Sequence, residues 1–118
     1  MSLYEEYIAT DYLETDSFIA GSDHVFEFIG LNDSNELFDV SACEMKWMLS
    51  PYAQPEYNLI QKTAIVSGSS SFIVSLSGNE TINLGGVYLQ QMEVTDGAGH
   101  VERPAQGIVI IRKAIPTQ

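Results

Sequence analysis

Residues 43–49 have the sequence CEMKWML, and residues 84–95 have the sequence LGGVYLQQMEVT. In both stretches large apolar side chains alternate with polar or smaller ones, which is the period of a β-strand with one buried face. A ring as large as that of Trp47 fills the space between two packed sheets, and a tyrosine at the start of a late strand, such as Tyr88, can bond back to the preceding corner. Together the two stretches predict an antiparallel immunoglobulin-like β-sandwich.

The same alternation continues in residues 22–30 and 71–77, and residues 88–95 and 107–113 are also typical of strands. Runs rich in Gly, Ser, Asn and Asp separate these stretches, and no helical pattern of about ten residues lies between them. We therefore expect an all-β fold of about seven strands in residues 21–115, preceded by an acidic arm or first strand in residues 1–20. The expected core consists of Phe26, Phe28, Trp47, Phe72, Val74, Leu76, Tyr88 and Met92.

Gln90 occupies the position at which antibody domains place the second cysteine of their inter-sheet disulfide, two residues after the tyrosine. The chain has one cysteine, Cys43, so no intrachain disulfide can form. If Tyr88 faces inward, Gln90 does too, and a buried amide needs hydrogen-bond partners. We expect packing alone to hold the two sheets together.

The charge of this chain is concentrated in its first half. The 118 residues carry a net charge of −11, which disfavours binding to nucleic acids and anionic membranes. Residues 1–56 hold twelve acidic side chains against Lys46 alone, whereas residues 57–118 are balanced. This pattern indicates either a solubilising half or a face that docks a basic partner or the basic end of another copy. The candidate docking residues are Glu5, Glu6, Asp11, Glu14, Asp16, Arg103, Arg112 and Lys113.

Four stretches, in their order along the chain, carry a family resemblance: FEF at 26–28, FDVS leading to MKW at 38–47, FIVSLS at 72–77, and GVYLQQMEVTD at 86–96. In these the chain resembles the immunoglobulin-like N-terminal modules of bacteriophage baseplate upper proteins and tail fibres. The resemblance implies a structural or assembly module of a phage or prophage tail, without catalysis. It also implies that the partners are other tail or baseplate proteins or copies of the chain, in the virion or in the bacterial cytoplasm as a prophage product.

Motifs for catalysis and metal binding are weak in this sequence. His24 and His100 lie in no recognised catalytic spacing, and the serines of residues 67–71 do not form a nucleophile elbow. We therefore expect no enzymatic activity, no cofactor and no zinc site. A calcium loop formed by Asp33, Asn35, Glu36 and Asp39 is the alternative to an ordinary polar turn.

An alternative function rests on two tyrosines in residues 51–57. Tyr52 and Tyr57 could together present aromatic rings to a sugar, as expected of a carbohydrate- or cell-surface-binding adhesion module of the same fold. The other interpretation is that both rings cap the open end of the sandwich. No polar cluster accompanies them, so a small-molecule ligand is not expected.

Overall fold

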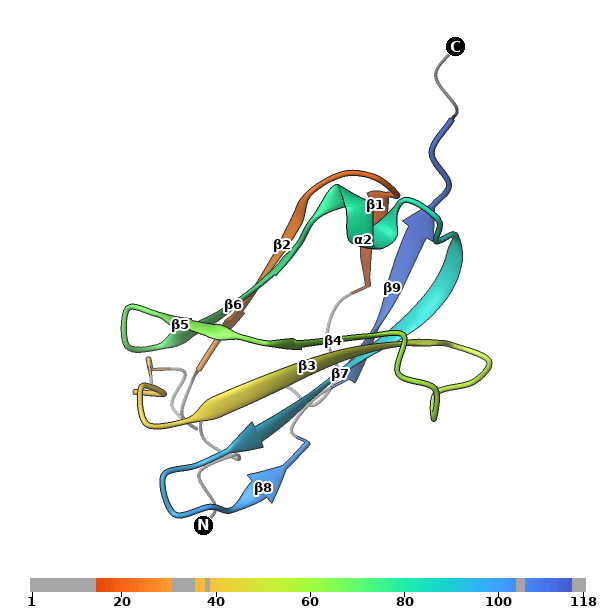
Figure 1. Cartoon of the computed structure of the whole chain (residues 1–118). Coiled ribbons are helices and arrows are strands. Elements are labelled where there is room, and N and C mark those ends of the chain that lie inside the picture. Colours follow the sequence, from red (N-terminus) through yellow and green to blue (C-terminus); the bar gives the residue numbers. More distant parts are fainter. Residues whose placement is uncertain (1–14, 31–35, 38, 104–105, 116–118) are drawn as a thin grey trace.

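The computed structural model describes residues 15–30, 36–37, 39–103 and 106–115. Within them two sheets pack face to face (Figure 1). One sheet has the strand order β1-β9-β7-β3-β4, with β8 paired to β7, and the other has the order β2-β6-β5. The elements are β1 (Asp16–Ile19), β2 (His24–Ile29), β3 (Glu44–Pro51), β4 (Ile60–Thr63), β5 (Ile65–Ser67), β6 (Ser71–Leu76), α2 (Gly78–Thr81), β7 (Gly86–Thr95), β8 (Val101–Glu102) and β9 (Gln106–Arg112).

The pairing of the strands is that of an immunoglobulin-like sandwich. β7 lies between β3 and β9 and is antiparallel to both, whereas β1 is parallel to β9, with Asp16 opposite Val109. In the second sheet β6 is antiparallel to both of its neighbours. The prediction of an all-β, antiparallel, immunoglobulin-like sandwich without a disulfide is confirmed.

The alternating stretches of the sequence supply the core between the two sheets. All eight expected core residues are buried, and the side chain of Trp47 is completely enclosed. Phe26 of β2 reaches across from the opposite sheet, and its ring centroid lies 5.1 Å from that of Trp47. Aromatic side chains of this size remove a large apolar area from water, so this contact is central to holding the sheets together.

The corner before β7 has the tyrosine bond that the sequence predicts. The Tyr88 hydroxyl accepts a hydrogen bond from the Gly85 amide at 3.0 Å and donates one to the Gly85 carbonyl at 3.3 Å. A phenol that satisfies both main-chain groups fixes the direction in which the chain enters β7. The inward orientation of Tyr88 and Gln90 is therefore confirmed.

Parts of the fold differ from the sequence-based expectation. β1 lies in the stretch assigned to an acidic arm or first strand, and there it contributes Phe18 to the core, with Ala20 just after it. The turn at residues 96–99 joins β7 to the short β8, which lies between the two last strands expected from the sequence. On the outward face of β7, Val87 is 49% exposed.

Glu80 connects the short helix α2 to the six-stranded sheet. Its carboxylate accepts hydrogen bonds from the Ser77 amide at 3.0 Å and from the Lys62 ammonium of β4 at 2.8 Å. The bond from Lys62 has the largest effect and the bond from Ser77 the next, and together they hold the pKa of the Glu80 carboxyl below its ordinary value of 4.5. Because charged partners favour the ionised form, the folded state binds this proton less readily than the unfolded chain does.

This depressed pKa predicts a small loss of stability in acid. The contribution is fully present above the unfolded value of 4.5, and it disappears as the pH falls through the lower folded value. We expect Glu80→Gln to lower the free energy of unfolding by about 0.5 kcal/mol near neutral pH, because the pair is partly exposed and screened by solvent. Urea unfolding of both proteins at about pH 7 and about pH 3 measures the difference in the free energy of unfolding, which should be smaller at the lower pH.

The matched control is Glu56→Gln, which removes an exposed carboxylate that forms no ion pair within the described residues. It should leave the stability unchanged at either pH. A stability loss for Glu80→Gln that stays constant between the two pH values would show that the loss does not come from the lowered pKa of Glu80.

Candidate interaction site

The candidate docking residues do not form one cluster in the described structure. Glu5, Glu6, Asp11 and Glu14 lie outside the described residues. Arg103 donates a hydrogen bond to Glu93 of β7 at 3.0 Å, so its charge is already paired within the domain. Arg112 ends β9 and Lys113 follows it, and neither forms an ion pair with a described residue. Asp16 of β1 lines the cavity between the two sheets, and Lys113 lines a separate, smaller pocket beside residues 82–84.

The two tyrosines proposed for sugar binding are both exposed. Tyr52 and Tyr57 lie in the connection between β3 and β4, and each is 57% exposed. The Tyr52 amide bonds to the Val87 carbonyl at 3.1 Å, and the Tyr57 amide bonds to the Gln54 carbonyl at 3.0 Å. Main-chain hydrogen bonds therefore fix the backbone that carries both rings, and both rings lie at the surface.

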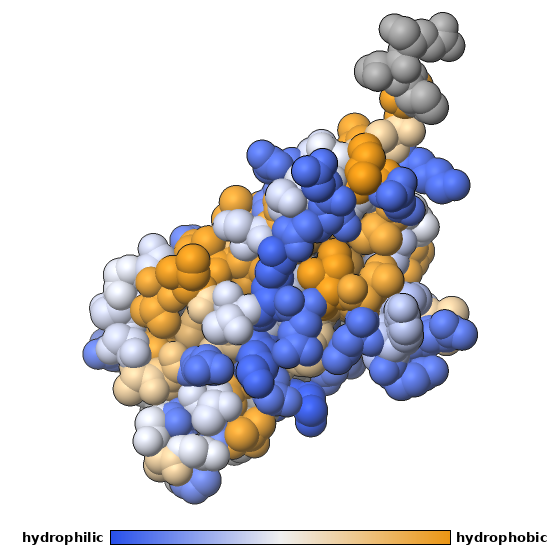
Figure 2. Space-filling view, in the orientation of Figure 1, coloured by the Kyte–Doolittle hydropathy of each residue, from blue (hydrophilic) through white to orange (hydrophobic). Residues whose placement is uncertain are grey.

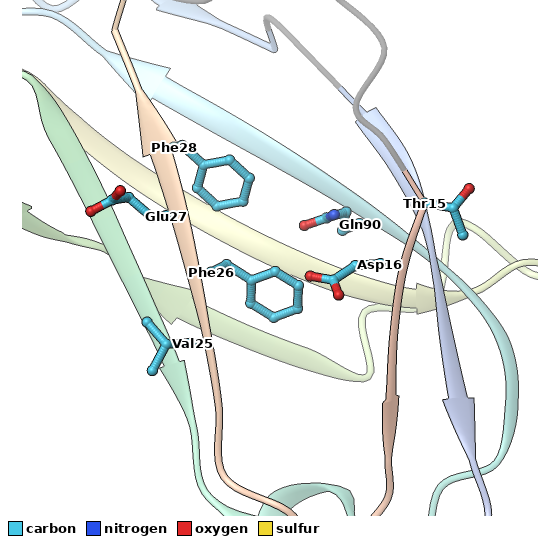
Figure 3. Close-up of a pocket in the computed structure, with 7 residues that line it drawn as sticks. All are labelled: Thr15, Asp16, Val25, Phe26, Glu27, Phe28 and Gln90. Carbon is cyan, nitrogen blue, oxygen red and sulfur yellow. The ribbon is translucent and has the colours of Figure 1, made fainter.

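A cavity of about 350 Å³ opens between the sheets where β1 and β2 face each other. In Figure 3 the rings of Phe26 and Phe28 point into this space from β2, and Asp16 and Gln90 point into it from the other sheet. The side chains of Val25 and Glu27 are turned away, so β2 borders the cavity with its main chain at these positions. The site thus combines an aromatic wall with an amide and a carboxylate.

Gln90 places a polar group in the centre of an apolar core. It is 2% exposed, and its Oε1 accepts a hydrogen bond of 2.8 Å from the Trp47 indole N–H. An amide also carries two donors on its nitrogen. No described residue accepts from the Gln90 Nε2. The Gln90 Nε2 is thus a buried donor, and the Gln90 side chain lines the cavity.

Asp16 at the mouth of the cavity is held by neighbouring groups. Its Oδ2 lies 3.1 Å from the Nε2 of His24, and its Oδ1 accepts from the Ser17 amide at 2.8 Å. The His24 ring stacks on Phe18, with centroids 4.2 Å apart and planes 10° from parallel. The Asp16 side chain remains 35% exposed, so its carboxylate is fixed and still accessible to a partner.

The proposed calcium loop is only partly described. Asp33 and Asn35 lie outside the described residues. Asp39 accepts bonds from the Ser41 hydroxyl and amide, which lower the pKa of its carboxyl, as expected of a polar turn. In the described part of the chain, no group of three or more His, Cys, Asp or Glu is placed to hold a metal ion.

The lone cysteine lies away from the cavity and is not exposed. Cys43 is buried beside the start of β3. Burial, with smaller effects of the carboxylates of Asp96 and Asp39, raises the pKa of its thiol. A protonated thiol is a weak nucleophile and a weak metal ligand, so Cys43 contributes to packing.

The sequence predicted Asp16 as one of the acidic docking residues. It did not predict that Asp16 pairs with His24 or that a cavity lies beside it. The alternation of residues 22–30 did place His24 on the inward face of its strand, together with Phe26. An inward histidine next to an acidic stretch was the one available signal for such a pair.

These features define the class of the molecule: an immunoglobulin-like β-sandwich with an open cavity between its two sheets. No protein-family model matches the sequence, and the comparison with curated proteins found no match. Among solved structures the chain is similar to part of an endo-fucoidan hydrolase from glycoside hydrolase family 107, with a TM-score of 0.56 and 10% sequence identity. The match covers 92% of this chain and 14% of that one, so the chain spans about a seventh of the hydrolase's length.

This likeness shows the fold, and it also corrects one expectation. The prediction that the chain is not an enzyme is contradicted, because a similar fold occurs within an endo-fucoidan hydrolase. The physical reason is that sandwiches of one architecture host many functions, so missing catalytic motifs in about a hundred residues do not exclude an enzyme context. Within the described residues, no helix is long and apolar enough to cross a membrane.

Proposed function

We propose that this domain is an assembly module that acts through protein–protein contacts. The resemblance to phage baseplate and tail-fibre modules suggests the setting, a phage or prophage tail, with tail or baseplate proteins or further copies of the chain as partners. The likeness to a small part of a much larger chain is consistent with a fold that is used as a building block. The proposal rests mainly on the outer face of the three-stranded sheet.

That outer face consists of Val25, Glu27 and Ile29 of β2, Ile73 of β6 and Ile65 of β5. Glu27 lies opposite Ile73, and Ile73 lies opposite Ile65, so the residues form a continuous row across the sheet. Ile65 is 71% exposed and Val25 is 59% exposed. Figure 2 shows hydrophobic atoms gathered over β5 and β6. Contiguous exposed aliphatic side chains with a charge among them are typical of surfaces that bind other proteins.

Light scattering on the full chain, alone and mixed with candidate tail or baseplate proteins from the same source, tests this proposal. We expect a complex of fixed stoichiometry that Ile65→Asp weakens by at least about tenfold, because a charge would be buried in an apolar contact. The matched control is Ile115→Asp, since Ile115 is 90% exposed and follows β9, in the other sheet. The mass of a single chain in every mixture would contradict the proposal.

A second candidate is a carbohydrate- or surface-binding module. The exposure of Tyr52 and Tyr57 favours it, and so does the likeness to part of an enzyme that is named for fucoidan. Exposed aromatic rings provide stacking surfaces for sugars. Binding to fucoidan or to other glycans that disappears when both tyrosines are replaced with alanine would favour this candidate over the first.

A further inference from the structure

Among the described residues β2 is an edge strand, with β6 as its one neighbour and its other side free. The Gly30 amide just after β2 bonds to the Ser70 carbonyl at 2.7 Å. Antiparallel pairs alternate between hydrogen-bonded and non-bonded residues. The main-chain groups of Val25, Glu27 and Ile29 therefore point away from β6, towards the free side.

The free side of β2 runs along the cavity. Val25 and Glu27 line the cavity while their side chains turn away from it, which leaves their main chain facing the open space (Figure 3). Behind this edge lies the buried Gln90 amide, whose nitrogen has no acceptor among the described residues. A buried donor without a partner costs free energy, so a ligand that supplies an acceptor there is favoured.

We propose that the β2 edge binds an extended, basic segment of a partner protein, which adds to the sheet as a strand and inserts one polar side chain into the cavity. This inference rests on the proposed function and names the site and the chemistry of the partner. Strand addition supplies main-chain hydrogen bonds to Val25, Glu27 and Ile29, and the cavity supplies specificity for the inserted side chain.

The charges at this edge favour a basic segment. The Asp16 carboxylate is accessible at the mouth of the cavity, and Glu27 extends from the same edge on the outer face. The chain as a whole carries a net charge of −11, so it attracts a basic segment and repels an acidic one. Asp16 offers an acceptor and the Gln90 nitrogen offers a donor, a combination that matches an inserted Asn, Gln, Ser or Thr side chain.

A synthetic peptide with the sequence Lys-Val-Lys-Asn-Lys-Val-Lys, labelled for fluorescence anisotropy, tests the proposal on the full chain. Its alternation directs valine and asparagine to the cavity side and lysine outward. We expect binding that protects the Val25, Glu27 and Ile29 amides from hydrogen exchange. Two matched control peptides, one with glutamate in place of every lysine and one with proline in place of asparagine, should bind at least about tenfold more weakly.

Two variants of the chain locate the contact. Val25→Pro removes an outward amide without disturbing the bonds to β6, and Asp16→Asn removes a charge while keeping the shape of the side chain. Each variant should weaken the binding of the basic peptide by about tenfold. Asp16→Asn provides the test if Val25→Pro does not fold. Ile65→Asp, on the outer face, should leave peptide binding unchanged.

The outcomes separate this inference from the proposed function. Equal binding of the basic and acidic peptides, or no binding at all, would overturn the inference, even if complexes through the outer face persist. Protection of the three amides in the free chain would assign the edge to the chain's own residues. Protection that rises with protein concentration would assign it to a second copy, and either result overturns a partner segment as the occupant.

Discussion

Replacing Trp47 with alanine should lower the free energy of unfolding by about 3–5 kcal/mol. The side chain is completely enclosed and contacts Phe26 of the opposite sheet, so its removal leaves a large void where the two sheets meet. The rigid strands on either side prevent the void from closing fully, which adds a cavity cost to the lost transfer free energy. Urea unfolding followed by circular dichroism measures the change.

Tyr52→Ala is the matched control for this prediction, since Tyr52 is an aromatic residue just after the same strand but is 57% exposed. It should change the stability by at most about 0.5 kcal/mol. If Trp47→Ala does not fold, Trp47→Phe provides a milder variant with a smaller expected loss. Similar effects of Trp47→Ala and Tyr52→Ala would contradict the central position of Trp47.

The second large effect is an energetic coupling between Trp47 and Gln90. Gln90→Met keeps the length of the side chain but leaves the indole N–H without its acceptor, and Trp47→Phe leaves the amide without its donor. Each buried polar group left unpaired costs about 1–3 kcal/mol. The double variant leaves neither group, so we expect it to be more stable than the sum of the two single losses by about 1 kcal/mol or more.

Unfolding measurements on the wild type, both single variants and the double variant give this coupling. The control cycle pairs Gln90→Met with Phe72→Leu. Phe72 is buried in β6 of the other sheet, where it pairs with Phe28, so its loss should add to that of Gln90 without coupling. Additivity of Trp47→Phe with Gln90→Met would show that the indole–amide bond contributes nothing.

Much of the fold could be predicted because the central strands carry strong patterns. β2, β3, β6 and β7 alternate over six or more residues, and their inward residues make up most of the core. The strands that the sequence did not predict are β4, β5 and β8, which have two to four residues each. β1, with four residues, lies in the stretch for which an arm and a first strand were both left open. So short a stretch shows hardly one full alternation, and its pairing depends on neighbours distant in the sequence.

The site was less predictable than the fold. Gln90 was recognised as a buried amide that needs a partner, because its spacing from Tyr88 fixed its direction. The partner, Trp47, lies 43 residues away, and only the pairing of β3 with β7 brings the two together. The cavity depends on which side of β2 is uncovered, and that is a property of strand order which the alternation within one strand does not encode.

The replacement of a disulfide by Phe26, Trp47 and Gln90 has a consequence for redox chemistry. A sandwich joined by a cystine depends on an oxidising environment, whereas the contact of Phe26 with Trp47 and the bond of Trp47 to Gln90 involve no sulfur. Cys43, the one thiol, is buried and has a raised pKa, so it forms the reactive thiolate less readily. The stability of this domain is thus independent of the thiol–disulfide balance around it.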